Sequence, residues 1–311
     1  MAGVLIYSDK QNISLELLTA AQLLKNGTGA KINALTVNND EQAAILSGSG
    51  ADVVYKVTDA DVSLADSNII AEIVKQAAEK AEADIIFLGS NRRGKELAGR
   101  LAQKTEAGCL TDVGGLALEG GTIECTRNSL GGATVARQQI TTSKKVIALS
   151  PHSFEAAGSA AAGNTLELDI MKPDITSKLV EVKNRSADAV DIQNAEVLVI
   201  VGQGVEKDDL VHASAIAKAL GGEVACSKPV ATDKKWFSED FIIGLSGKQC
   251  RPQLAIILGV SGQVQFTVGI RDAHVIAAVN NDENAFIFQL ADYAMVADSK
   301  DVLAGLAKAL S

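Results

Sequence analysis

Three short apolar runs near the end of the chain constrain its fold more than any other feature. Leu254–Leu258 leads directly into the turn Gly259-Val260-Ser261-Gly262, and residues 274–279 end in Asn280-Asn281-Asp282. A third run is centred on Met295-Val296. Apolar runs of this length, bounded by glycine and polar residues, predict strands that are buried on both faces of a parallel sheet. We therefore expect an α/β fold in this part of the chain.

The turn at residues 259–262 has the composition of an anion-binding loop. Backbone N–H groups before a helix, glycines that allow close approach and a serine hydroxyl suit a phosphate or pyrophosphate. The same residue types also have a structural use, because serines and asparagines after strands cap helices and turns. One glycine-rich turn does not decide between these two interpretations.

The N-terminal half alternates apolar runs with helical patterns. Strands are expected at residues 3–8, 31–37, 53–57 and 85–89, and helices ending near Gly27, at 40–46 and at about 67–82. This alternation implies parallel βαβ units with right-handed crossovers. The turn at 91–95, with two arginines and a lysine, is interpreted either as a phosphate site or, more readily, as a solvated or interface turn.

A polar, irregular stretch separates this half from the C-terminal runs. Residues 178–182 fit an edge strand, and 185–194 have the composition of a linker, since a new strand is expected at 196–201. We therefore divide the chain into an N-terminal domain at 1–187 and a C-terminal domain at 188–311.

The C-terminal domain should gather its polar motifs at one place. The strand at 196–201 ends in Gly202-Gln203-Gly204, a helix is expected at 208–220, and the strand at 223–226 ends in Ser227-Lys228-Pro229. Ligand groups collect beyond the carboxyl ends of parallel strands, where each of these motifs falls. The final helix, at 299–310, has an apolar face made of Val302, Leu303, Leu306 and Leu310.

Composition narrows the classes of partner and location. The net charge of −9 argues against nucleic acid or an anionic membrane as the main partner. No apolar run approaches the about 20 residues that span a bilayer, and the first residues do not read as a secretion signal. The four cysteines are widely separated, as expected for reduced thiols in a cytoplasmic protein. The three histidines form no catalytic or metal-binding constellation.

Five blocks of the second half together resemble the FAD-binding domain of the alpha subunit of electron transfer flavoproteins. They occur in the same order and at the same spacing as in that family, and they are residues 226–229, 244–248, 259–266, 278–282 and 285–294. A weaker resemblance covers nearly the whole chain. It implies an α/β fold of two domains, an N-terminal nucleotide-binding-like sheet domain and a C-terminal doubly wound, parallel-sheet domain that binds FAD.

The resemblance also implies a set of cofactor-binding residues and no catalytic residue or metal ligand. Serine and glycine amides would hold the pyrophosphate and the flavin edge, while Asn280 and Asp298 would address the ribose and adenine end. The expected FAD contacts are Gln203, Ser227, Lys228, Ile243, Gly244, Leu245, Ser246, Gly247, Ser261, Gly262, Gln263, Val264, Gln265, Phe266, Asn280 and Asp298.

Four positions depart from the family pattern in the same direction. Gln203 and Lys228 stand where the family has arginine, Phe266 where it has a histidine that hydrogen-bonds the flavin, and Asn281 where it has lysine. Lysine lacks the planar fork of arginine, and phenylalanine donates no hydrogen bond. These substitutions reduce the positive charge and donor character around a dianionic cofactor, which puts FAD retention in question.

The resemblance implies an electron carrier rather than a substrate-transforming enzyme. The expected protein is the alpha subunit of a heterodimer with an electron transfer flavoprotein beta subunit. It would take electrons from flavin dehydrogenases, such as the acyl-CoA dehydrogenases of fatty acid β-oxidation, and pass them to a further acceptor. In this family the alpha subunit's N-terminal domain holds no nucleotide of its own, and the AMP belongs to the beta subunit.

Two alternatives remain open. The first is a structural or regulatory subunit that has lost its flavin, which the four departures keep open. The second is an NAD-dependent α/β enzyme, which is disfavoured because the turn at 259–262 lacks the G-x-G-x-x-G spacing and no catalytic constellation accompanies it.

Overall fold

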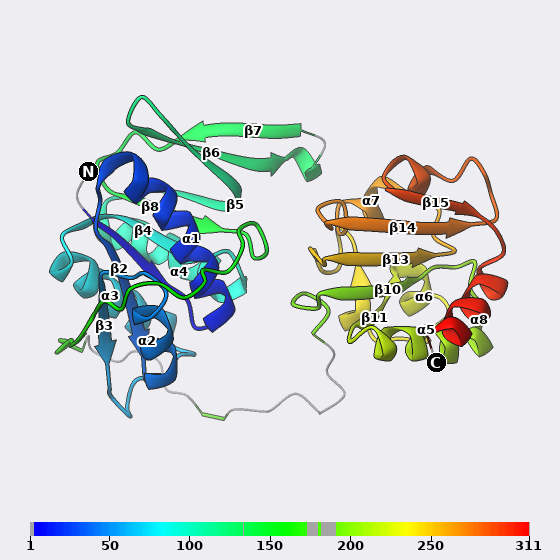
Figure 1. Cartoon of the computed structure of the whole chain (residues 1–311), viewed down its shortest axis with the longest axis horizontal. Helices are drawn as coiled ribbons and strands as arrows, with labels where there is room; N and C mark the ends of the chain where they lie inside the picture. The colour runs from blue at the N-terminus through cyan, green and yellow to red at the C-terminus, as the bar shows by residue number, and fades with distance from the viewer. Residues whose placement is uncertain (1–2, 133, 173–179, 182–190, 311) are drawn as a thin grey trace. The chain divides into compact units, whose positions relative to one another are not determined.

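The computed structural model describes residues 3–132, 134–172, 180–181 and 191–310. The chain divides into two compact units, Met1–Val182 and Lys183–Ser311, each built on its own sheet (Figure 1). This arrangement confirms the predicted two-domain α/β fold class. The predicted boundary at 187/188, most of the predicted linker and most of the predicted strand at 178–182 lie outside the described residues, so they stay predictions.

Unit 1 contains a nine-stranded sheet in the order β7-β6-β5-β8-β4-β1-β2-β3-β9. Its strands are β1 (Gly3–Tyr7), β2 (Ile32–Val37), β3 (Val53–Val57), β4 (Ala83–Gly89), β5 (Gly108–Glu119), β6 (Thr122–Ser129), β7 (Thr134–Gln139), β8 (Lys145–Leu149) and β9 (Asn164–Glu167). From β5 to β9 in this order, every pair of neighbouring strands is parallel, as the βαβ pattern predicts. The chain runs from β1 through β2 to β3 on one side and then crosses to β4 on the other side of β1. The boundary between β1 and β4 is therefore the topological switch point of the sheet.

Helices cover both faces of this sheet. They are α1 (Gln11–Thr28), α2 (Asp40–Ser47), α3 (Ser67–Lys80) and α4 (Arg92–Thr105). Apolar side chains of α1 and α2 belong to one core cluster, and those of α3 and α4 to a second cluster on the opposite face. Asn39 is the N-cap of α2, and its side chain accepts a hydrogen bond from the Gln42 N–H.

The prediction of a separate turn at 91–95 is wrong. Asn91 is the N-cap of α4, and its Oδ1 accepts a hydrogen bond from the Gly94 N–H at 2.8 Å. Residues from Arg92 onward are therefore the first turn of the helix. The asparagine supplies the capping oxygen that starts the helix two residues after the strand ends.

The antiparallel part of the sheet was not anticipated. Strands β5, β6 and β7 pair antiparallel with one another, and β5 joins the parallel strands through β8. Gly120 and Gly121 form the two-residue loop between β5 and β6, with φ values of +55° and +81°. A pair of glycines with positive φ is the usual signal of a tight hairpin, so the sequence did contain the clue.

Unit 2 contains a six-stranded parallel sheet in the order β12-β11-β10-β13-β14-β15. Its strands are β10 (Val197–Val201), β11 (Glu223–Ser227), β12 (Ile242–Ile243), β13 (Leu254–Leu258), β14 (Val275–Asn280) and β15 (Tyr293–Val296). Its helices are α5 (Leu210–Ala219), α6 (Lys228–Thr232), α7 (Val264–Thr267) and α8 (Ser299–Ala309), with short 3₁₀ turns at Lys207–Asp209, Glu239–Phe241 and Phe286–Gln289.

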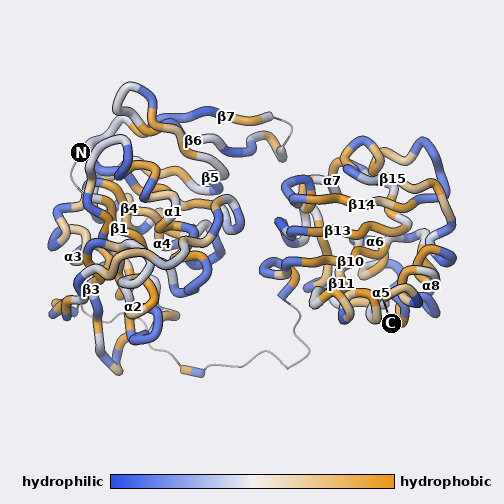
Figure 2. Tube along the Cα trace, viewed as in Figure 1, coloured by the Kyte–Doolittle hydropathy of each residue, from blue (hydrophilic) through white to orange (hydrophobic). Residues whose placement is uncertain are grey.

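The core of unit 2 lies on both faces of its sheet, as in a doubly wound fold. Figure 2 shows the apolar central strands of both units and the mixture of apolar and polar residues along their helices. The predicted apolar face of the last helix is correct for Leu303, which is fully buried, but wrong for Leu310, which is exposed. Leu310 is the C-cap residue, one position beyond the last helical turn that packs on the sheet.

Candidate functional site

The candidate site begins where the strand order of unit 2 reverses. Strands β10 and β13 are neighbours, and the chain leaves them toward opposite edges of the sheet, so their carboxyl ends mark the topological switch point, where ligands of doubly wound sheets bind. The loops that follow them touch backbone to backbone: the Gly204 N–H donates to the Gly259 carbonyl oxygen at 3.0 Å. A Cβ on Gly202 would lie 2.1 Å from that same oxygen, so glycine is required there for the two loops to meet.

Asn280, at the end of β14, fixes the shape of the loop at 259–262. Its side-chain Nδ2 donates to the Val260 carbonyl oxygen at 2.9 Å, and its Oδ1 accepts from the Asp282 N–H at 3.0 Å. The residue is 8% exposed. Because both ends of its amide are engaged within the protein, Asn280 positions the loop. The predicted contact between Asn280 and a ribose stays a prediction.

The same loop is tied to a later segment of the chain. The Ile287 N–H donates to the Ser261 carbonyl oxygen at 3.1 Å, while the Ser261 side chain is exposed. Gly262 has a φ of +86°, and a Cβ there would lie 2.1 Å from the Ile287 nitrogen. The turn that the sequence indicated therefore depends on glycine for both its backbone conformation and its packing.

A second group of predicted residues comes together through β11 and β12. Ser227, the last residue of β11, is the register partner of Ile243 in β12. After β12, the Leu245 N–H donates to the Gln265 carbonyl oxygen at 2.7 Å, which joins the loop at 244–247 to α7. Leu245, Ser246 and Gly247 are exposed at this edge.

The predicted residues thus form one strip along the carboxyl edge of the unit 2 sheet, hereafter called the edge strip. The edge strip consists of Gln203, Ser227, Lys228, residues 243–247, residues 261–266, Asn280 and Asp298. Asp298 follows β15, and its Oδ1 accepts from the Lys300 N–H at 2.9 Å, so it is the N-cap of α8. Such a residue can cap a helix with one side-chain atom and contact a ligand with another, so the two interpretations of the sequence are compatible.

Four consecutive backbone N–H groups in the edge strip lack a hydrogen-bond partner. Within the described residues, the N–H groups of Gly262, Gln263, Val264 and Gln265 make no hydrogen bond. The side chains of Gln263, Val264 and Gln265 are exposed, so this run of donors is open to a ligand. Consecutive unpaired N–H groups next to glycines favour an anionic group such as a pyrophosphate.

Positive charge in the edge strip is sparse. Lys228 is exposed, and Lys234 instead holds the first loop, donating from Nζ to the carbonyl oxygens of Gln203 at 2.8 Å and Val205 at 3.2 Å. The Lys234 ammonium also lies 4.2 Å from the centre of the Trp236 ring. No sequence motif pointed to Lys234, because its role depends on a loop some thirty residues earlier in the chain.

Phe266 differs from its neighbours in the edge strip, because its side chain is 7% exposed and belongs to a core cluster with Ile243, Ile270 and Ile287.

Burial raises the pKa of the Cys226 and Cys250 thiols to about 12, so both stay protonated and unreactive at neutral pH. Over the described part of the chain, no group of three or more His, Cys, Asp or Glu side chains is placed to bind a metal ion.

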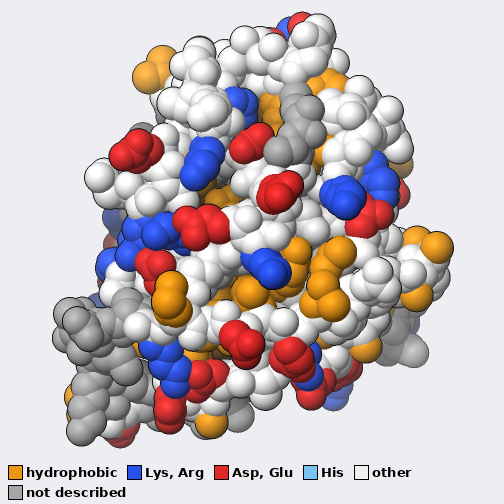
Figure 3. Space-filling view, turned by 90° about the vertical axis from the view of Figure 1, so that its left-hand side faces the viewer, with side chains coloured by type: hydrophobic (Ala, Val, Ile, Leu, Met, Phe, Trp, Pro, Cys, Tyr) orange, Lys and Arg blue, Asp and Glu red, His pale blue; other side chains and the backbone are white. Residues whose placement is uncertain are grey.

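The cations at the start of α4 in unit 1 are mostly used within the protein. Arg93 forms an ion pair with Asp9 at 2.9 Å, and Lys95 forms one with Asp112 at 2.6 Å. Figure 3 shows a face of the molecule on which basic and acidic side chains are interspersed rather than separated. A surface of this kind does not attract a polyanion.

None of the described helices combines the length and apolar character that crossing a bilayer requires.

Comparisons with known proteins agree with this architecture. Residues 5–172 match the electron transfer flavoprotein domain, and residues 191–271 match the electron transfer flavoprotein FAD-binding domain. Protein FixB of Escherichia coli O17:K52:H18 is 31% identical over 314 aligned positions, which cover 99% of this chain and 98% of that protein. Protein FixB of Shigella flexneri gives the same identity and coverage.

Solved structures add no further argument. A glycosyl transferase family 9 protein from Veillonella parvula is 12% identical, with 99% of this chain and 88% of that chain covered, at a TM-score of 0.26. The family assignment therefore depends on the two matched domains, which lie in the two units, and on the full-length similarity to FixB proteins. The chain belongs to the alpha-subunit family of electron transfer flavoproteins.

Proposed function

We propose that this chain is the FAD-carrying alpha subunit of a heterodimeric electron transfer flavoprotein and transforms no organic substrate itself. The observation that carries the proposal is the run of four unpaired N–H groups at residues 262–265, in a domain that matches an FAD-binding family. These donors are held open by Asn280 and by the glycines of the switch-point loops.

The residues of the edge strip fit the parts of FAD by their chemistry. The N–H groups of residues 262–265 would hold the pyrophosphate, with the exposed Ser261 and Ser246 hydroxyls beside them. Asp298 would accept from ribose or adenine donors through the oxygen that its cap does not use. When bound, the flavin supplies the redox chemistry, and the protein supplies binding, orientation and exclusion of water.

The partners and location are also part of the proposal. A beta subunit would complete the heterodimer, and flavin dehydrogenases such as the acyl-CoA dehydrogenases of fatty acid β-oxidation would be the electron donors, in the cytoplasm. The family membership supports a flavoprotein subunit in general. The particular donor follows from the family resemblance alone.

A point substitution tests the role of the N–H groups. Val264 is the first residue of α7, its side chain is 65% exposed, and the preceding Gln263 has φ −60° and ψ 152°. Proline is accepted at such a position, so Val264→Pro removes one N–H without strain. Losing a hydrogen bond to a charged phosphate should raise the FAD dissociation constant about ten- to hundredfold.

Val264→Ala is the matched control, because it removes the same side chain and keeps the N–H. The measurement is flavin fluorescence quenching during titration of each protein, coexpressed with its beta subunit, with FAD. Equal affinity in both variants would remove the N–H groups from the site. A purified heterodimer that neither shows flavin absorbance nor takes up FAD would instead support the flavin-lacking structural or regulatory subunit. Activity with a nicotinamide and no flavin would support the NAD-dependent enzyme.

A further inference from the structure

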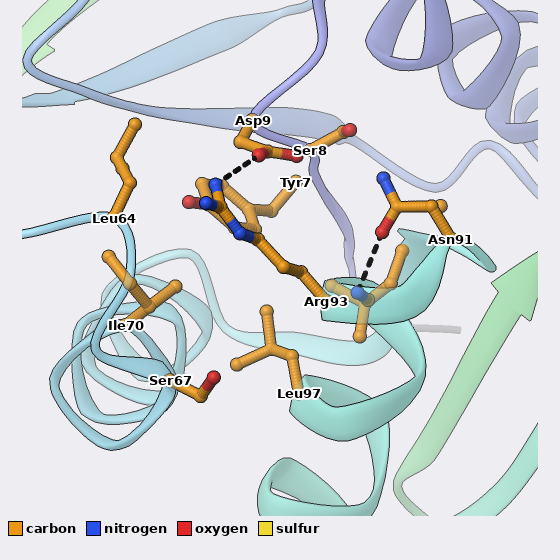
Figure 4. A pocket seen from close by; sticks show the side chains of 12 residues that line it. Tyr7, Ser8, Asp9, Leu64, Ser67, Ile70, Asn91, Arg93 and Leu97 are labelled. Carbon is orange, nitrogen blue, oxygen red and sulfur yellow. Dashed lines mark hydrogen bonds and ion pairs between the residues drawn. The ribbon is translucent and has the colours of Figure 1, made fainter. Parts of the chain in front are cut away.

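Unit 1 has a cleft at the amino edge of its sheet, where β4 and β8 begin and where α3 and α4 end; it is hereafter called the amino-edge cleft. Its cavity volume is about 210 Å³, which is room for a small organic molecule rather than for one or two waters. At the carboxyl edge, where β1 and β4 end, the cavity volume is only about 30 Å³. There the Arg93 side chain reaches over Tyr7 to pair with Asp9 (Figure 4). In this part of unit 1, the amino-edge cleft is therefore the place that can admit a ligand.

The floor of the amino-edge cleft is apolar and made of small or branched aliphatic side chains. Ala78 from α3, Ile86 from β4 and Val146 from β8 line it, and all three are buried. They belong to the same core cluster, so the floor is continuous with the packed face of the sheet. Such a floor accepts an aliphatic group and gives a polar one no partner.

One side of the amino-edge cleft is negative. Glu79, Glu82 and Asp84 line it, and the side chains of Glu82 and Asp84 make no hydrogen bond or ion pair with any residue that the structure describes. Helices α3 and α4 both end here, and the negative ends of their dipoles add to the charge of the carboxylates. This side therefore attracts a cationic group such as an ammonium.

A bulge in β4 sets the position of Asp84. Gly3 of β1 pairs with Ala83 and Val4 pairs with Ile85, so Asp84 is an extra residue in β4. Bulges re-aim a side chain relative to the regular alternation of a strand. The half-buried Asp84 carboxylate lines the cleft from this bulge.

The opposite side of the amino-edge cleft carries one unpaired cation. Lys75 pairs with two glutamates of its own helix at 3.5 and 4.0 Å, and Lys145 Nζ donates to the Thr142 carbonyl oxygen. The exposed Lys144 side chain makes no hydrogen bond or ion pair with a described residue. Lys144 and Asp84 directly precede the register partners Lys145 and Ile85 on neighbouring strands. The cleft thus presents opposite charges side by side that are not paired with each other.

We propose that the amino-edge cleft binds a free α-amino acid with an aliphatic side chain. Its ammonium group contacts Asp84 and Glu82, its carboxylate contacts Lys144, and its side chain lies on the apolar floor. A phosphate or a dicarboxylate is opposed by the acidic side chains and the helix ends, while a diamine would bring its second ammonium against Lys144. The site lies in a different unit from the edge strip and does not involve the flavin.

Equilibrium dialysis of the full chain, saturated with FAD, against labelled L-leucine tests the proposal. Leucinamide lacks the carboxylate and N-acetyl-leucine lacks the ammonium, so each should bind about tenfold more weakly than leucine. Asp84→Asn should raise the dissociation constant of leucine about three- to tenfold and leave that of N-acetyl-leucine unchanged. Lys144→Gln should weaken leucine by a similar factor and leave leucinamide unchanged. These pairings assign each residue to one end of the ligand.

Glu82 and Glu106 provide a matched pair of variants. Both are exposed glutamates in the left-handed conformation at the end of a helix, with φ of +49° and +53°, but only Glu82 lines the cleft. Glu82→Gln should weaken leucine binding, and Glu106→Gln should not. Equal effects of the two would mean that surface charge in general, rather than this site, attracts the ligand, and the proposal would be wrong.

Three further outcomes would overturn the assignment. They are no saturable binding of leucine at millimolar concentration, equal affinity for leucine and its two analogues, and displacement of leucine by FAD, which would locate the binding in unit 2. Ala107→Leu adds a larger side chain to the cleft from the end of α4 and should abolish binding in a protein that still melts cooperatively. Undiminished binding by that folded variant would also contradict the proposal.

Discussion

The side-chain amide of Asn280 donates a hydrogen bond to the main-chain carbonyl oxygen of Val260 at 2.9 Å. This bond links the end of β14 to the loop after β13, across neighbouring strands. It holds the glycine-rich loop in the conformation that leaves the N–H groups of residues 262–265 unpaired. Asn280, whose position in the sequence fits a ligand contact, thus also holds the loop of the site in place.

Replacing Asn280 with alanine should weaken FAD binding without unfolding the protein. The substitution leaves the buried Val260 carbonyl oxygen without its partner, which costs about 1–3 kcal/mol, and loosens the loop. We expect a lower melting temperature and an FAD affinity reduced by about tenfold. Asn284→Ala is the control, because Asn284 is exposed and only its backbone N–H is hydrogen-bonded. Unchanged affinity in Asn280→Ala would show that the loop does not need this support.

Lys234 should matter for stability although no motif contains it. Lys234→Met keeps a long, unbranched side chain but removes the ammonium, and with it the bonds to the Gln203 and Val205 carbonyl oxygens and the cation–π contact with Trp236. The expected loss is about 1 kcal/mol of unfolding free energy, measured by urea denaturation. Lys235→Met, at the exposed neighbouring position, should be neutral. A Lys234→Met protein as stable as wild type would mean that water replaces both bonds.

Phe266→His separates core packing from flavin contact. Because Phe266 is buried among apolar side chains, histidine there should lower the stability of the FAD-free protein by about 1.5–3 kcal/mol. If this position faces the flavin as the family resemblance implies, the new donor should strengthen FAD binding. Phe266→Leu is the control, since it keeps an apolar side chain and adds no donor. Calorimetric melting without FAD and titration with FAD measure the two effects, and an unchanged affinity in Phe266→His would argue that the side chain belongs only to the core.

Asp52 should make stability depend on pH in the acid range. Burial alone would raise the pKa of Asp52, but hydrogen bonds from Lys25 Nζ at 2.6 Å and from the Ile32 N–H at 2.8 Å outweigh it and hold the pKa below its ordinary value. A lowered pKa stabilises the fold above the ordinary value of about 4 and loses that contribution as the pH falls through the folded-state pKa. Asp52→Asn should therefore melt about 2–4 °C lower than wild type at pH 7, with the difference shrinking below about pH 4.

The matched substitution for this test is Asp169→Asn, because Asp169 is exposed and has no partner among the described residues. It should leave the pH dependence of melting unchanged. A difference between Asp52→Asn and wild type that stays constant from pH 7 to pH 3 would contradict the assignment.

The four cysteines should differ in reactivity. Burial raises the pKa of Cys125 to about 11, with help from the Glu124 charge, and those of Cys226 and Cys250 to about 12, while Cys109 is only half-buried. At pH 8, iodoacetamide should therefore modify Cys109 first, and the other three only after unfolding. Peptide mass spectrometry over time measures each rate. Early labelling of Cys226 would show that β11 opens locally in the native protein.

Much of the candidate site was predictable because its residues follow strands. In a parallel sheet the carboxyl ends meet at one edge, so Gln203, Ser227, Ser261 and Asn280 had to lie along it once the strands were located. What each residue does there was not predictable. The burial of Phe266, the bonding of Asn280 within the protein and the hold of Lys234 on another loop depend on contacts between distant segments.

The switch point of the unit 1 sheet, between β1 and β4, shows the same limit. Asn91 and Arg93 were noticed as a cluster of polar residues after a strand, but nothing in their spacing paired Arg93 with Asp9 or placed Tyr7 beneath it. Tyr7 ends β1, Asp9 follows it, and Arg93 lies in α4 after β4; β1 and β4 are adjacent only because the sheet order reverses there.

By itself, the sequence determined the class of fold, most strands and the family, because apolar periodicity and glycine turns act over a few neighbouring positions. Only the tertiary structure decided the antiparallel strands β5 to β7, the exposed position of Leu310 and the partners of Asn280, Lys234 and Asp9. The physical reason is that hydrogen bonds and ion pairs between remote segments are selected by how the sheets order their strands, and many orders satisfy the same local pattern.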